Sequence, residues 1–185
     1  MGKFVGGLIL GVVGVFAIVY LYFASGMAPV ATAAPAMPLE KMFARMALHA
    51  RIDKESPKTV PIAADDATYT AGAGIYKDHC AVCHGLPGQP QTAIAKGMYP
   101  RPPKLMEGTG VTDDPAGETY WKVDGGIRMT GMPGFGKSLS TTQIWQVSVM
   151  LANADKMPQS IKDSLTAPAA LPAAAVPETK LPAKR

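Results

Sequence analysis

The chain has 185 residues, 48% of them hydrophobic, and a formal net charge of +4 at pH 7. This length allows one folded domain with appendages, and the positive charge lies near the two ends: residues 1–63 carry +3 and residues 166–185 carry +2, whereas residues 64–165 carry −1. Because the central part is nearly neutral and has no basic stripe with interleaved aromatic residues, we expect no nucleic acid among the partners.

The first predicted element is an apolar run without a charged residue, residues 4–24. As a helix it would span about 31 Å, enough to cross the hydrocarbon core of a membrane. Tyr20 and Tyr22 near its far end suit a membrane interface. We therefore expect residues 1–24 to be an uncleaved signal anchor. The alternative is a cleaved signal peptide that ends among the small residues 28–34.

Residues 25–65 are predicted to be a linker that contains one amphipathic helix. The flanking stretches are rich in Pro and small residues, which favours irregular structure. Between them, over residues 39–51, apolar side chains recur at helical spacing next to three basic residues. This helix could lie on anionic lipid headgroups, dock on a partner subunit, or pack its apolar side against the central domain. The sequence leaves these alternatives open.

The only two cysteines of the chain lie in the run Cys80-Ala81-Val82-Cys83-His84. C-x-x-C-H is the attachment pattern of a c-type haem. Each thiol can add to one vinyl group of the same porphyrin, and the following histidine is held where its imidazole can ligate the iron. A local disulfide, half of a zinc site and a thioredoxin-like redox pair are the alternatives. A zinc site needs a second ligand pair, and a redox pair needs a βαβ setting that is not visible here.

Two predicted helices enclose the central domain. The first covers residues 67–79 with Asp66 as its N-cap, and the second covers residues 141–154 with Ser140 as its N-cap. A short helix is expected at residues 118–123. No strand pattern occurs between the two enclosing helices, so the sequence predicts an all-α domain dominated by loops.

Together, these helices and the C-x-x-C-H run resemble a class I cytochrome c domain, in which the N- and C-terminal helices cross over a small residue. The resemblance covers about residues 66–160 and implies the class I cytochrome c fold for a haem domain at residues 66–165. It also implies that Gly72 and Tyr76 on the first helix meet Trp145 on the last.

The resemblance implies a second iron ligand as well. The segment Thr130-Gly131-Met132-Pro133 matches the T-G-M-P segment that carries the distal methionine in bacterial class I cytochromes. Its glycines and proline describe a loop, which would allow close approach of the backbone to a flat ring. Met132 is therefore the predicted distal ligand. Met129, in the same loop, is the substitute.

Three further residues are expected near one covalent haem c. The resemblance implies that a proline carbonyl, Pro102 or Pro103, accepts a hydrogen bond from the ligating His84. Arg101 could pair with a haem propionate or be a solvated loop residue. Trp121 could pack on the ring edge or donate its indole N–H to a propionate.

An iron bound by His84 and Met132 has no open position, so it can exchange an electron but does not readily bind a substrate. The sequence thus predicts an electron-transfer protein rather than an enzyme: a membrane-tethered monohaem cytochrome c on the periplasmic face of a bacterial cytoplasmic membrane. Its partners would be redox proteins of a respiratory or photosynthetic chain, met as a free carrier or within a larger complex. The alternative is a haem protein or enzyme whose Met132 dissociates to admit a small ligand. Residues 166–185 are predicted to be a disordered Ala/Pro-rich tail.

Overall fold

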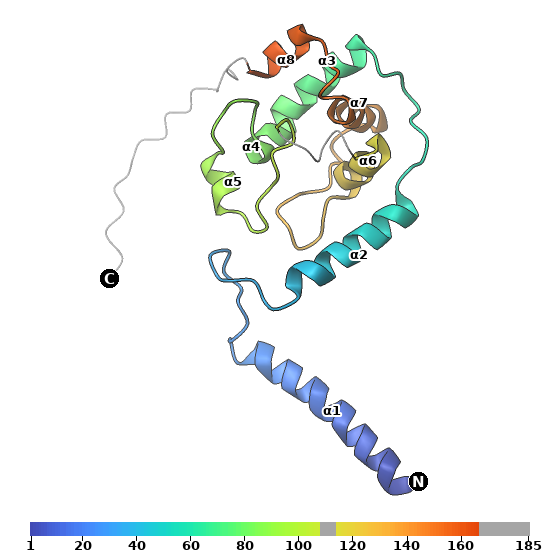
Figure 1. Cartoon of the computed structure of the whole chain (residues 1–185), viewed down its shortest axis with the longest axis vertical. Helices are drawn as coiled ribbons and strands as arrows, with labels where there is room; N and C mark the ends of the chain where they lie inside the picture. The colour runs from blue at the N-terminus through green and yellow to red at the C-terminus, as the bar shows by residue number, and fades with distance from the viewer. Residues whose placement is uncertain (108–113, 167–185) are drawn as a thin grey trace, which may run out of the picture.

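The computed structural model describes residues 1–107 and 114–166, a part of the chain that contains helices and no strand. The predicted all-α class is therefore confirmed (Figure 1). In chain order the elements are α1 (Gly2–Ala24), α2 (Glu40–Glu55), α3 (Asp66–Ile75), η1 (Tyr76–Cys80), α4 (Ala81–His84), α5 (Ala93–Gly97), α6 (Ala116–Gly125), α7 (Thr141–Ala152) and α8 (Gln159–Thr166). Except for Thr166, the predicted tail at residues 166–185 lies outside the described residues.

The apolar N-terminal run forms one helix, α1, which projects away from the other helices (Figure 1). None of its residues is buried, and its most apolar stretch has a mean hydropathy of 2.5. Length and composition would let α1 cross a membrane, and a signal sequence near an N-terminus has the same properties.

The helix expected at residues 39–51 is α2, which extends to Glu55. Its one buried residue is Ile52, whereas three of its larger apolar side chains are more than half exposed: Met42, Phe43 and Met46. The alternative in which the apolar side of this helix packs on the central domain is therefore wrong. The helix contacts α6 through its other side.

The expected crossing of the first and last helices of the domain is present as the contact between α3 and α7. A Cβ atom added to Gly72 would lie 2.5 Å from the carbonyl oxygen of Gln146 and 2.7 Å from the Cβ of Met150. A glycine is therefore needed at this position, because any side chain would push the two backbones apart.

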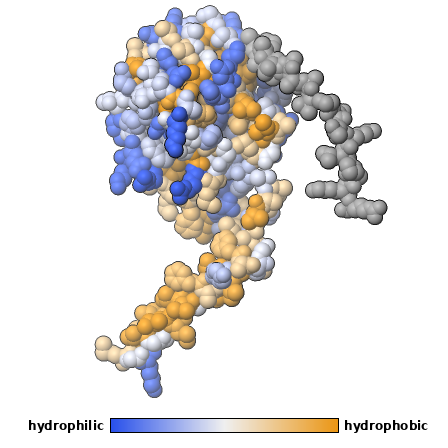
Figure 2. All heavy atoms as spheres, turned by 180° about the vertical axis from the view of Figure 1, so that it is seen from behind, coloured by the Kyte–Doolittle hydropathy of each residue, from blue (hydrophilic) through white to orange (hydrophobic). Residues whose placement is uncertain are grey.

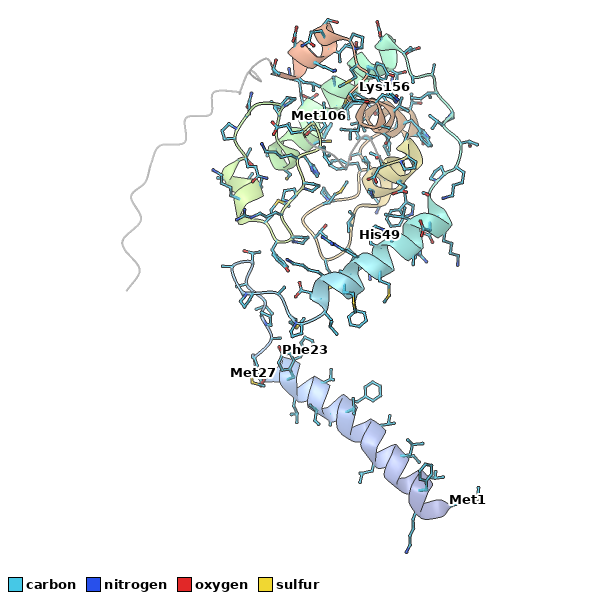
Figure 3. The ribbon with its side chains drawn as sticks, viewed as in Figure 1. Met1, Phe23, Met27, His49, Met106 and Lys156 are labelled. Carbon is cyan, nitrogen blue, oxygen red and sulfur yellow. The ribbon has the colours of Figure 1, made fainter. Side chains whose placement is uncertain are left out.

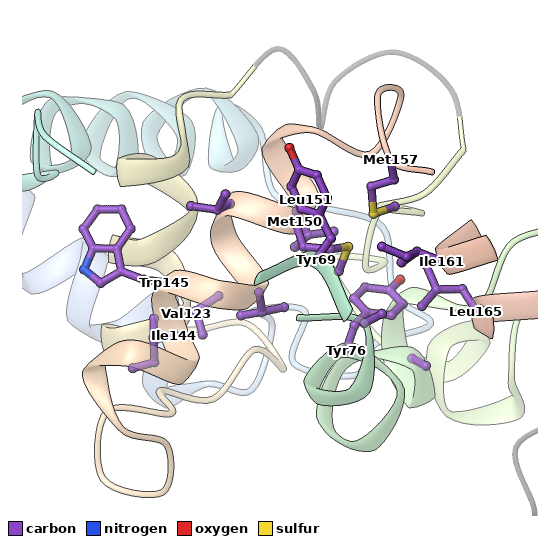
Figure 4. Close-up of a cluster of buried hydrophobic side chains, with 14 of the residues drawn as sticks. Tyr69, Tyr76, Val123, Ile144, Trp145, Met150, Leu151, Met157, Ile161 and Leu165 are labelled. Carbon is purple, nitrogen blue, oxygen red and sulfur yellow. The ribbon is translucent and has the colours of Figure 1, made fainter. Parts of the chain in front are cut away.

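The prediction that Trp145 takes part in this crossing is wrong. Its ring stacks on Tyr120 of α6, with the centroids 4.3 Å apart and the planes at 24°. The residues that meet Gly72 are four apart on one face of α7, and Trp145 lies a helical step of about 100° away, towards α6. Figure 4 shows Trp145 at one side of the buried cluster, away from Tyr69 and Tyr76.

The helix expected at residues 67–79 differs from the observed one at both ends. Its N-cap is Asp65, not Asp66: the Asp65 carboxylate accepts a hydrogen bond from the Thr68 N–H at 2.8 Å. After Ile75 the helix widens into the π-helical turn η1, which ends at Cys80. Such a turn accommodates one extra residue, so it changes the direction in which the next side chains point.

The N-terminus of α7 is as predicted. The Ser140 hydroxyl accepts from the Gln143 N–H, and the Gln143 side chain accepts in turn from the Ser140 N–H, which forms a capping box. The helix ends at Ala152, two residues earlier than expected. The short helix predicted at residues 118–123 is α6, longer by a few residues at its ends.

Candidate functional site

The C-x-x-C-H run occupies the end of η1 and the short helix α4, next to the core. Cys80 and Cys83 are both free thiols and form no disulfide. Three residues apart on a helical turn, their side chains lie on neighbouring positions of one face. Burial, with a smaller contribution from Cys83, raises the pKa of Cys80 to about 12. The Cys80 thiol is therefore neutral near pH 7 in this environment.

The turn that holds these residues is fixed by a buried tyrosine. Tyr76 is fully buried, and its hydroxyl donates to the Gly85 carbonyl oxygen at 2.7 Å. Gly85 follows α4 directly and has a φ of 81°, a conformation that favours glycine. The bond therefore ties the residue after His84 back to the helix that precedes the motif.

His84 is placed to present one ring nitrogen to a metal. Its Nδ1 lies 2.8 Å from the carbonyl oxygen of Pro103. A carbonyl can only accept a hydrogen bond, so Nδ1 carries the proton and the lone pair of Nε2 remains free. Burial lowers the pKa of His84, and the bond to Pro103 opposes this effect. Of the two prolines considered from the sequence, the structure thus selects Pro103.

The remaining two residues expected around a haem have different surroundings. Arg101 is exposed and forms no ion pair within the described part of the chain. The indole N–H of Trp121 donates to the Glu55 carboxylate of α2 at 3.2 Å. It is therefore engaged with the linker helix rather than free to meet a propionate. The expected contact of Trp121 with the haem was based on its residue type alone, and the sequence gives no sign that Glu55 lies beside its indole ring.

The loop with the predicted distal methionine is closed at its neck by backbone contacts. The Phe135 N–H donates to the Val123 carbonyl oxygen at 2.8 Å, and the Gly136 N–H donates to that of Asp124 at 3.0 Å. Gly126 has a φ of 68°, and a Cβ added there would lie 2.5 Å from the backbone nitrogen of Gly134. The two ends of the loop approach so closely only because both positions lack a side chain.

Within this loop the two methionines differ sharply. Met132 is partly buried and packs against the hydrophobic core, and its N–H donates to the Thr130 hydroxyl at 3.1 Å. Met129 is 92% exposed and has a φ of 59°. Only Met132 therefore has its thioether held among the residues of the domain.

Sequence reasoning missed the contact made by Met98, at the start of the segment 98–103 that connects the two predicted ligand regions. At one end, the Met98 side chain contacts Gly131, beside Met132. At the other end, Pro103 accepts the bond from His84. Methionine in a loop carries no signal of such a contact, because the contact depends on how two distant loops pack.

The residues present fit a covalent haem c. The domain offers two thiols on one helical turn, an imidazole whose Nε2 is free, and a partly buried thioether on a glycine-rich loop. These are the donor types that attach and ligate haem. Across residues 1–107 and 114–166, no group of three or more His, Cys, Asp or Glu is arranged to hold a metal ion.

A match to a family model agrees with the residues found at this site. The family model described as "Cytochrome C oxidase, cbb3-type, subunit III" matches residues 67–149. Among curated proteins, none matches the chain. Among solved structures, a chain of the Kuenenia stuttgartiensis reducing HAO-like protein complex Kustc0457/Kustc0458 is similar at 23% identity and a TM-score of 0.45. That match covers 55% of this chain and 52% of the other. A c-type cytochrome domain transfers electrons through a covalent haem c. The family match over residues 67–149 and the C-x-x-C-H spacing of Cys80 and Cys83 identify such a domain in the chain.

Proposed function

We propose that this protein is a membrane-tethered monohaem cytochrome c whose iron is held by His84 and Met132 and passes single electrons between protein partners. The observation that carries the proposal is the 2.8 Å contact between His84 Nδ1 and the Pro103 carbonyl oxygen. This contact fixes the tautomer that leaves Nε2 available as a ligand. The partly buried position of Met132 supports it as the second ligand.

Each element of the site has a defined part in this function. The haem supplies one-electron redox chemistry when bound. Cys80 and Cys83 would hold it covalently, and the Pro103 carbonyl makes the His84 imidazole a stronger ligand by polarising its N–H. A methionine thioether favours the ferrous state, so we expect a relatively positive reduction potential. Arg101, which is exposed on the same segment as Pro103, remains a candidate partner for a propionate.

Carbon monoxide binding to the reduced protein tests the ligand assignment. We expect the optical spectrum of the wild type to change little, because Met132 occupies the sixth position. Met132→Ala should open that position and give rapid, complete carbon monoxide binding. The matched control is Met129→Ala in the same loop, which should behave as the wild type because Met129 is exposed.

Two results would contradict this assignment. Rapid carbon monoxide binding by the wild type would favour the alternative, a haem protein or enzyme that admits a small ligand at the distal side. A spectrum altered by Met129→Ala and not by Met132→Ala would assign the sixth position to the other methionine.

The proposed organisation is an anchor at residues 1–24, a linker at 25–65 and a haem domain at 66–165. The length and hydropathy of α1 support the anchor. Thioether attachment of haem in bacterial c-type cytochromes occurs outside the cytoplasm, which supports a location on the periplasmic face. The partners there would be complexes of a respiratory or photosynthetic chain. Co-purification from mild detergent separates two forms of this function: a stable stoichiometric partner indicates a fixed subunit, and its absence indicates a free carrier.

A further inference from the structure

One face of α2 is apolar and exposed to water. Each of its large side chains has two others three or four residues away, so they form a single stripe along the helix. Each is 52–59% exposed: Leu39 at the N-cap, then Met42, Phe43 and Met46. A continuous exposed stripe of this kind indicates a surface that is covered by another apolar medium in the working molecule.

The opposite face of α2 is fixed to the haem domain. Ile52 is only 3% exposed, and the Glu55 carboxylate accepts the indole N–H of Trp121 at 3.2 Å. Just beyond the helix, the carbonyl oxygen of Pro57 lies where a side chain on Gly117 would be. Because these contacts hold α2 to α6, the direction of the apolar stripe is set relative to the haem domain.

The stripe lies on the side of the domain where the anchor is attached. The linker between α1 and α2 covers only residues 25–39, a reach of at most about 50 Å when fully extended. Figure 3 shows Phe23 and Met27, at the end of α1, below the helix that carries His49. In Figure 2 the hydrophobic surface continues from α1 through the linker to the lower edge of the domain. The membrane that would hold α1 is therefore the nearest apolar medium.

The charges of α2 are compatible with a lipid surface. Within Glu40–Glu55 there are four basic residues and three acidic ones, which gives a net charge of +1. The basic side chains are exposed: Lys41, Arg45, Arg51 and Lys54. Arg51 is paired with the Glu55 carboxylate at 2.6 Å. At about 100° per residue, Arg45 and Lys54 flank the stripe, so their long side chains can reach headgroup phosphates while the stripe contacts acyl chains. With so small a net charge, the apolar stripe contributes more to such binding than attraction to anionic lipids.

We propose that α2 is an interfacial helix that lies in the surface of the membrane crossed by α1, with its stripe of Leu39, Met42, Phe43 and Met46 among the acyl chains. The proposal rests on the anchoring by α1 that is part of the proposed function. The protein is then attached to the membrane at two points, α1 and α2, and not by a flexible tether alone. The haem domain, which contacts α2 around Ile52 and Glu55, then has a preferred orientation relative to the membrane.

Photo-crosslinking of the full-length holoprotein in nanodiscs of phosphatidylcholine and phosphatidylglycerol tests this proposal. A benzophenone amino acid is placed at Phe43 or Met46 of the stripe, and lipid adducts are detected by mass spectrometry. Ile94 on α5 is the matched control, because it is an apolar residue of similar exposure, 57%, on another part of the domain. Val12 in α1 reports whether the anchor itself is inserted.

We expect abundant lipid adducts at positions 12, 43 and 46 and few at position 94, with little loss at 43 and 46 when phosphatidylglycerol is omitted. Adducts at position 12 without adducts at 43 and 46 would overturn the interfacial helix and leave the anchor intact. Absence of adducts at position 12 would overturn both. If the same positions in native membranes crosslink to a protein rather than to lipid, the stripe is a subunit interface and the proposal is wrong.

Discussion

Replacing Gly72 by Ala should destabilise the domain, although alanine is the better helix former. The added Cβ would lie 2.5 Å from the Gln146 carbonyl oxygen and 2.7 Å from the Met150 Cβ. Ordinary contact begins near 3.4 Å, so α3 and α7 would have to separate by roughly 1 Å. Because the first obstacle is backbone, no rotamer change can relieve it.

The size of the effect follows from two opposing contributions. Overpacking of a well-packed contact costs about 1–3 kcal/mol, whereas Gly→Ala inside a helix contributes about 0.5–1 kcal/mol in favour of folding. With the midpoints of both ranges, the expected net loss in the free energy of unfolding is about 1.3 kcal/mol. For a domain of this size, that lowers the melting temperature by roughly 5–10 °C.

The matched control is Gly74→Ala, two residues later in the same helix. A Cβ at Gly74 meets nothing within 4 Å, so only the gain in helix propensity remains and this variant should be slightly more stable than the wild type. Thermal unfolding of both holoproteins, followed by far-UV circular dichroism, measures the difference. If Gly72→Ala is as stable as Gly74→Ala, the close crossing of α3 and α7 is refuted.

Three further predictions concern the helix ends and the ligand loop. Tyr76→Phe should lose about 1–3 kcal/mol of stability in denaturant titrations, because the buried Gly85 carbonyl oxygen loses its donor at 2.7 Å. The hydrogen bond from the Thr68 N–H lowers the pKa of Asp65 from its ordinary value, so the stabilising effect of this bond is present above the unfolded-state pKa and is lost as the pH falls through the folded-state pKa. Asp65→Asn still caps the helix but does not titrate, so stability should fall less steeply below about pH 4. Gly126→Ala, at a φ of 68°, should prevent closure of the loop neck and speed carbon monoxide binding.

Each of these predictions has a control in the chain. For the tyrosine, Tyr69→Phe removes a hydroxyl that donates no hydrogen bond to the described residues, so an equal loss from both variants would contradict the specific role of the bond. For the cap, parallel acid titration curves of wild type and Asp65→Asn would show that Asp65 does not contribute. For the loop, a Cβ on Gly125 meets nothing within 4 Å, so Gly125→Ala is the control, and equal effects of the two glycine variants would refute the importance of the neck.

The chemistry of the domain could be predicted from the sequence because local spacing determines it. The distance between Cys80 and Cys83 is set by one turn of helix, whatever surrounds them. The apolar run of α1 and the cap at Ser140 are also local, since they depend on hydropathy and on a hydrogen bond three residues away. The family match over residues 67–149 agrees with this part of the prediction.

The partners of individual side chains required the tertiary structure. Packing decides three of these partners. His84 bonds to Pro103 and not to Pro102. Trp121 bonds to Glu55, and Met129 is exposed although the neighbouring Met132 is partly buried. Periodicity cannot state which of two neighbouring residues meets a distant loop, because a shift of one residue turns a helix by about 100°.

Hydropathy and local spacing alone predict a membrane-length helix, an all-α domain and a site for one covalent haem. They do not predict which face of α2 meets the domain and which faces away from it, because the apolar stripe from Leu39 to Met46 would suit a protein core and a lipid surface equally well. Only the contacts of Ile52 and Glu55 with the domain show that the stripe points outward.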